Sequence, residues 1–149
     1  MRYFQGVMPL CASLLQCFNE QVAYWLLRLL LARCRLVQVD MPLYSAFMVR
    51  LDEEVRWVLP QVHAKLEECG LGVDYFAMKW VMGLFSEDMS QPMQLAVWDV
   101  LCQTSLDYLV YLALALFESQ QQEILTGEAD TINTLLKTDL KSRLSQLNC

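Results

Sequence analysis

The side chain with the clearest chemical use near the start of the chain is the amide of Gln5, in Tyr3-Phe4-Gln5-Gly6. An amide both accepts and donates hydrogen bonds, so it can hold a water molecule against a second polar group. Gly6 beside it permits a sharp turn of the backbone. Taken without its surroundings, Gln5 is better explained as an exposed polar residue just before a helix.

The other titratable residues form no recognisable catalytic set. Glu53-Glu54 and Glu67-Glu68 are neighbours in sequence, and adjacent residues of a helix point apart, so neither is a ready acid–base pair. His63, the single histidine, has no serine or cysteine partner in a known motif. Asp99 is expected to be a hydrogen-bond partner within a helix. These observations disfavour a hydrolase.

The cysteines do not have the spacing of a metal site. They are Cys11, Cys17, Cys34, Cys69, Cys102 and Cys149, with no Cys-x-x-Cys among them. A zinc site needs clustered ligands at short spacing, so we expect no metal centre. Most of these thiols fall at apolar helix positions and should behave as small buried hydrophobes. No signal peptide is evident, so the sequence predicts a reduced, cytoplasmic setting.

Composition limits the remaining classes of function. The 149 residues carry a net charge of −6, which disfavours a protein that binds the phosphate backbone of nucleic acids. Hydrophobic residues make up 56% and charged residues 19%. The apolar runs over 24–32 and 106–117 are shorter than the roughly 20 residues that span a bilayer. The high content of hydrophobic residues therefore predicts either core helices or an apolar surface that a partner covers. Self-association through such a surface is one outcome.

Hydrophobic spacing predicts helices along the whole chain. Apolar residues recur at intervals of three and four, which is typical of amphipathic helices, and no alternating strand pattern occurs. The predicted helices cover residues 6–18, 20–34, 44–59, 60–69, 75–85, 91–102, 105–125 and 130–149. The predicted N-caps are Asn19, Asp74 and Ser90, and the predicted breaks are Pro60, Gly70 and Gly127. The sequence thus favours an all-α fold.

Two expectations concern burial in these helices. Segment 20–34 is hydrophobic nearly all round, so other helices should enclose it. Trp25, Trp80 and Trp98 fall at core-facing positions and should be packing residues, whereas the place of Trp57 is less certain.

Four stretches in a fixed order point to a family. They are Tyr3-Phe4-Gln5-Gly6, Ala23-Tyr24-Trp25, Trp80-Val81-Met82-Gly83-Leu84-Phe85 and Val97-Trp98-Asp99. In this order and at these spacings, the set resembles the later part of a TBC-type Rab GTPase-activating domain. The resemblance covers about residues 3–125. It implies a multi-helix TBC-like domain lacking its N-terminal part over residues 1–125, and a C-terminal amphipathic helix over 126–149 that is part of the domain or appended to it.

The resemblance also implies a role and a site. TBC domains supply a glutamine in trans to a Rab-family GTPase during vesicle trafficking, and the matching residue here is Gln5. Tyr3 would brace its loop, and Gly6 would bring the backbone near the nucleotide. GTP and Mg²⁺ would be carried by the GTPase, so the chain would need no cofactor of its own. It would meet membranes only through that partner, with recruitment to endomembranes left open.

One part of the family pattern does not occur. The Ile-x-x-Asp-x-x-Arg that supplies an arginine finger is absent; around Asp52 the position three later is Val55, with Arg56 one step beyond. An arginine finger contributes about 10³–10⁵ in rate. We therefore expect the chain alone to be a poor activator or none. Two hypotheses stay open: a fragment or variant of a Rab GTPase activator, and a catalytically inactive helical module that binds a GTPase or another protein.

Overall fold

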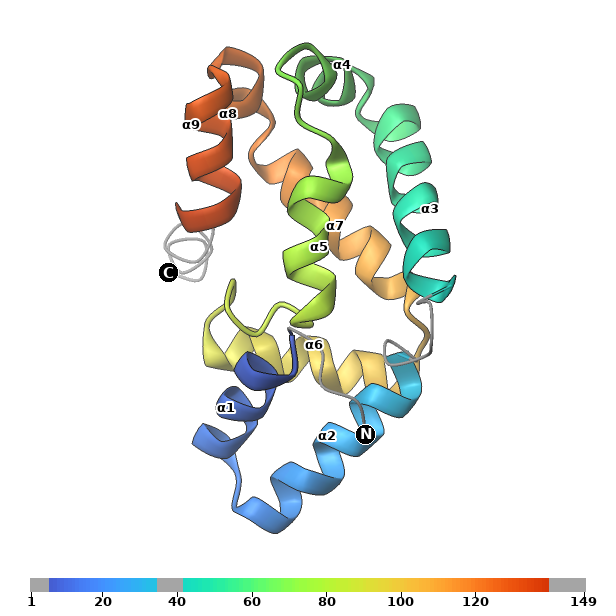
Figure 1. The fold of residues 1–149 in the computed structure, drawn as a ribbon, viewed down its shortest axis with the longest axis vertical. Coiled ribbons are helices and arrows are strands. Elements are labelled where there is room, and N and C mark those ends of the chain that lie inside the picture. Colours follow the sequence, from blue (N-terminus) through green and yellow to red (C-terminus); the bar gives the residue numbers. More distant parts are fainter. Residues whose placement is uncertain (1–5, 35–41, 140–149) are drawn as a thin grey trace.

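The computed structural model describes residues 6–34 and 42–139, which fold into helices joined by short connections (Figure 1). In chain order the elements are α1 (Val7–Cys17), α2 (Glu20–Cys34), α3 (Pro42–Val58), α4 (Pro60–Glu68), α5 (Val73–Met82), α6 (Gln91–Gln103), α7 (Asp107–Ser119), α8 (Gln121–Thr126), α9 (Ala129–Thr134) and the π-helical turn η1 (Leu135–Asp139). No strand occurs in these two ranges. The predicted all-α fold is confirmed.

The helices form two groups on either side of α6 (Figure 1). At one end, α1 and α2 diverge as a V, and α2 packs on α6. At the other end, α3 contacts α4, α5 and α7, and α4 contacts α8. The loop between α5 and α6 therefore lies where the two groups meet.

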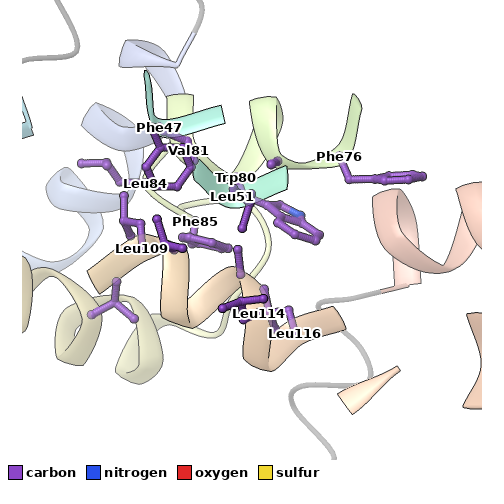
Figure 2. Close-up of a cluster of buried hydrophobic side chains, with 14 of the residues drawn as sticks. Phe47, Leu51, Phe76, Trp80, Val81, Leu84, Phe85, Leu109, Leu114 and Leu116 are labelled. Carbon is purple, nitrogen blue, oxygen red and sulfur yellow. The ribbon is translucent and has the colours of Figure 1, made fainter. Parts of the chain in front are cut away.

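Trp80 of α5 is at the centre of the core (Figure 2). Its ring is fully buried, with its centroid 5.9 Å from that of Phe85 and 5.3 Å from that of Phe117 in α7. Phe47 and Leu51 of α3 belong to the same buried cluster. The predicted burial of Trp80 is confirmed, and Trp98 of α6 is buried as well.

Several predicted starts and stops are confirmed. The backbone N–H of Val22 donates to Asn19 Oδ1 at 3.0 Å, which caps α2. Pro60 is the first residue of α4, where its missing N–H leaves no hydrogen bond unmade. Gly70 follows α4 with φ of +69°, a conformation that favours glycine at a helix end. Ser90 precedes α6 as predicted, although its side chain forms no capping hydrogen bond.

Helix α5 begins earlier than predicted. It starts at Val73, with Gly72 as the cap residue in an extended conformation, so the prediction of Asp74 as N-cap is wrong. Asp74 lies one position inside the first turn instead. A carboxylate there still interacts favourably with the positive end of the helix dipole.

Helix α5 also ends earlier than predicted, at Met82 rather than Phe85. Leu84 and Phe85 have φ of 47° and 60°, a region that side-chain-bearing residues rarely adopt. Both side chains are fully buried. The Phe85 N–H donates to the Trp80 carbonyl at 2.8 Å, and Trp98 Nε1 donates to the Leu84 carbonyl at 3.0 Å. Core packing thus overrides the local helical preference.

The helix predicted over 105–125 is divided at Gln120 into α7 and α8. The Ser119 hydroxyl donates to the Leu116 carbonyl at 2.8 Å, and the Gln120 N–H bonds instead to the Phe117 carbonyl, three residues back. Serine competes with the backbone ladder in this way near helix ends. The predicted break at Gly127 is confirmed.

Two burial predictions on the outer helices are wrong. Helix α2 is not enclosed, because α1 and α6 cover only its inner side, and Trp25 is 58% exposed. On α3, Val58 is exposed although its position fits the apolar spacing of that helix. Trp57 beside it is 87% exposed.

The end of the described chain packs inward. Ile132, Leu135 and Leu136 are buried, as expected for the inner side of the predicted amphipathic helix, and they lie in α9 and η1, which follow each other without a break. Leu140, Leu144 and Leu147, which continue the same apolar spacing, lie outside the described residues. In the described ranges, no helix combines the length and apolar character needed to cross a bilayer.

Candidate functional site

The three residues of the predicted site are adjacent at the start of the chain. Tyr3 and Gln5 lie outside the described residues, and Gly6 is the first residue described. Gly6 is buried and caps α1 in an ordinary right-handed conformation, with φ of −83° and ψ of −9°. The sharp-turn explanation of this glycine is therefore not needed.

Close approach of two backbones explains Gly6. A Cβ at this position would overlap the carbonyl group of Met82 and lie 3.0 Å from the Gly83 nitrogen. The start of α1 thus lies directly against the end of α5. This contact fixes the point at which the chain enters α1, one peptide bond after Gln5.

A groove of about 900 Å³ opens beside Gly6. Its walls come from the start of α1, the loop after α4, the outer face of α5, the loop after α5 and η1. The lining residues are Gly6, Pro9, Gly70, Leu71, Gly72, Asp74, Tyr75, Met78, Lys79, Met82, Gly83, Glu87 and Lys137. We call this the Gly6 groove.

Two lysines shape one wall of the Gly6 groove. Lys79 Nζ lies 2.8 Å from Asp88 Oδ1 and donates to the Lys137 carbonyl at 3.1 Å. Lys137 Nζ lies 3.4 Å from the centre of the Tyr75 ring, a cation–π contact. Residues 58 positions apart are thereby held together.

Buried hydrogen bonds hold the loop after α5. Gln94 of α6 is buried, and its Nε2 donates to the carbonyls of Ser86 and Met89, the latter at 2.9 Å. Asp88, also buried, accepts from Lys79. Because the loop is anchored from both α5 and α6, the groove wall is preorganised for a partner.

The other sequence candidates have structural roles. His63 is buried, with Nε2 3.1 Å from Asp52 Oδ1 and Nδ1 3.6 Å from Glu67 Oε2. No group of three His, Cys, Asp or Glu residues able to hold a metal occurs in the ranges that the structure covers. Asp99 is exposed, and its backbone carbonyl accepts from Gln103.

The described cysteines are half-buried free thiols rather than fully buried ones: Cys11, Cys17, Cys69 and Cys102. Burial raises the pKa of the Cys102 thiol, the negative charge of Asp99 adds to this, and Arg33 opposes it. Cys102 is thereby kept as a thiol and is a poor nucleophile.

Sequence reasoning missed Gln94, Lys79 and Lys137. A glutamine within the apolar pattern of residues 91–102 was the available signal for Gln94, because a buried amide must find hydrogen-bond partners. The two lysines carry no such signal, since their meeting depends on the tertiary fold.

Two of the four motif stretches meet at the loop after α5. Trp80 packs against Phe85, and Trp98 holds the Leu84 carbonyl. Residues 1–125 match the family described as the Rab-GTPase-TBC domain. The chain belongs to this family. Among relatives of the TBC-family chain is mouse Carabin (Mus musculus), 27% identical over 146 residues. That match covers 89% of the chain and 32% of Carabin, so the chain spans about a third of this relative's length.

Replacing Gly6 with alanine tests the backbone contact. The added methyl would meet the Met82 carbonyl, and overpacking of this kind costs about 1–3 kcal/mol. We expect Gly6→Ala to lower the free energy of unfolding by that amount, measured by urea denaturation. The comparison variant is Gly70→Ala, whose new methyl group would meet nothing within 4 Å. The positive φ of residue 70 alone should lower its free energy of unfolding, by about 1–2 kcal/mol. An unchanged stability in Gly6→Ala would contradict the contact.

Proposed function

We propose that this TBC-family chain stimulates GTP hydrolysis by a Rab-family GTPase, with Gln5 inserted in trans into the nucleotide site. The observation that supports this most is the position of Gly6, whose backbone packs at the edge of a 900 Å³ groove in a chain whose residues 1–125 match the TBC family. Gln5 is bonded directly to Gly6. In this proposal its amide would act from the margin of that groove.

The activator need not take part in the covalent steps of the reaction. GTP hydrolysis depends on placing the attacking water and stabilising charge on the transferred phosphoryl group. The carbonyl of Gln5 would accept a hydrogen bond from the water, and its NH₂ would donate one toward the γ-phosphate. GTP and Mg²⁺ would be carried by the GTPase. The GTPase would also recruit the complex from the cytoplasm to endomembranes.

The Gly6 groove suits a protein partner. It combines apolar surface from Met78 and Met82 with carboxylates of Asp74 and Glu87 and the cation of Lys137. Interfaces of this mixed composition are typical of non-obligate complexes. Tyr3, two residues before Gln5, would brace the loop that carries the amide.

A second candidate is a catalytically inactive module that binds a GTPase or another protein. No Ile-x-x-Asp-x-x-Arg occurs within these 149 residues, so the chain by itself supplies no arginine finger of that pattern. Without that arginine, Gln5 accounts for only part of the acceleration, because one positioning donor contributes about 10²–10³ in rate.

Single-turnover GTP hydrolysis by a panel of Rab proteins tests the proposal. We expect the wild-type chain to stimulate at least one Rab protein and Gln5→Ala to lose that stimulation entirely. Gln122→Ala, which alters an exposed amide on α8, is the matched control and should keep the wild-type rate. Undiminished stimulation by Gln5→Ala would remove Gln5 from the mechanism. Binding without stimulation by the wild type would favour the inactive module.

A further inference from the structure

Helix α2 presents an apolar face that nothing in the described chain covers. Val22, Tyr24, Trp25 and Leu29 are all exposed large hydrophobic side chains. Positions 22, 25 and 29 follow the spacing of one helix face, while the buried residues of α2, such as Ala23 and Leu30, fall on the opposite side. We define the α2 face as Val22, Tyr24, Trp25, Arg28 and Leu29.

The α2 face continues into an apolar groove of about 430 Å³ between the α1–α2 pair and α6. Leu26 lines this groove and lies one helical turn from both Val22 and Leu29, so face and groove form one surface. Phe18 of α1 and Leu95 of α6 supply the other walls. This groove shares no lining residue with the Gly6 groove.

Arg28 is a cation on one flank of this surface. Its guanidinium carbon lies 5.8 Å from the Tyr24 ring centroid and 5.4 Å from that of Trp25. Among the described residues Arg28 forms no ion pair, whereas Arg50 pairs with Asp107 and Arg56 with Asp52. In a chain of net charge −6, an unneutralised arginine between two exposed aromatic rings indicates a partner that supplies the carboxylate.

We propose that the α2 face binds an amphipathic helix of a second protein, with an apolar stripe on Val22, Trp25 and Leu29 and a carboxylate opposite Arg28. Amphipathic helices lie with their apolar side in grooves of this kind. Tyrosine, tryptophan and arginine are the residue types that most often dominate binding energy. A second copy of this chain is disfavoured as the occupant, because two chains that each carry a net charge of −6 repel one another.

Phage display tests this proposal: a library of randomised helical peptides is selected for binding to the full chain. We expect enriched peptides to carry apolar residues at helical spacing with Asp or Glu on one flank. The best peptide, labelled with fluorescein, should bind the wild type in fluorescence anisotropy. Trp25→Ala should weaken that binding at least about tenfold. Trp57→Ala removes a more exposed tryptophan elsewhere and should leave the affinity unchanged.

A charge reversal sharpens the test. Arg28→Glu should shift the selection from acidic to basic flanks, and replacing the peptide's carboxylates by amides should weaken binding to the wild type alone. Failure to enrich any peptide, enrichment of basic flanks by the wild type, or equal affinity for Trp25→Ala would overturn the proposal. So would light scattering that shows the chain to be a dimer that Trp25→Ala dissociates, since the face would then belong to a second copy. None of these outcomes depends on Gln5.

Discussion

Joining a segment that carries Ile-x-x-Asp-x-x-Arg to the amino end of this chain is expected to raise its stimulation of GTP hydrolysis by about 10³–10⁵-fold. The motif is absent from the sequence, whereas the glutamine is present as Gln5. A glutamine orients water, but an arginine neutralises the charge that develops on the transferred phosphoryl group, so the two contributions are distinct. Single-turnover hydrolysis measures the gain.

Two variants of the joined protein serve as controls. Changing the arginine of the added segment to alanine should remove the whole gain while keeping the helical contacts of the segment. Gln5→Ala in the joined protein should reduce the rate by about 10²–10³. If the joined protein stimulates hydrolysis no faster than the original chain does, a missing arginine does not explain weak activity. The inactive binding module is then the better description.

Trp80→Ala is expected to lower the free energy of unfolding by about 3–5 kcal/mol. The Trp80 ring is fully buried between Phe85 and Phe117, so its removal leaves a cavity lined by aromatic rings. Since domains are stable by only about 5–15 kcal/mol, the variant should be close to unfolding at ordinary temperature. The expected fall in Tm is on the order of 10 °C, read by circular dichroism.

Trp57→Ala is the matched control for this prediction. It makes the same chemical change at a side chain that is 87% exposed, where substitutions stay within about 0.5 kcal/mol. Equal losses in the two variants would mean that Trp80 is not in the core. Trp80 Nε1 has no hydrogen-bond partner among the described residues. The expected loss of stability in Trp80→Ala therefore comes from packing and not from a broken hydrogen bond.

The helices could be predicted from the sequence because their signals are local. Asn19, Pro60 and Gly70 act within one turn of a helix end, and each has the predicted role. The end of α5 could not be predicted in this way. Leu84 and Phe85 leave the helical conformation because the core accepts their side chains, a gain that appears only after α3, α6 and α7 have assembled.

The exposed face of α2 could not be predicted from the hydrophobic pattern of that helix. Its hydrophobic pattern runs nearly all round, which predicts enclosure on every side. The periodicity cannot distinguish a face covered by the same chain from one available to another protein, and Trp25 proves to be exposed.

The site was predicted only in part. Gly6 was singled out by its position in the motif, and the structure shows its backbone against Met82. The expected approach of this backbone to a nucleotide stays a prediction. Gln5 and Tyr3 remain predictions, since they lie outside the described residues. Lys79 and Lys137 come from distant parts of the sequence, and no local pattern indicates that they meet across the Gly6 groove.

The tie between Lys79 and Lys137 has a consequence for shortened versions of the polypeptide. The match to the family model ends at residue 125, yet Ile132, Leu135 and Leu136 are buried and Lys137 covers Tyr75 beyond that point. A truncation at residue 125 would remove these core side chains together with one wall of the Gly6 groove. A fragment trimmed to the family boundary is therefore expected to be less stable than the whole chain.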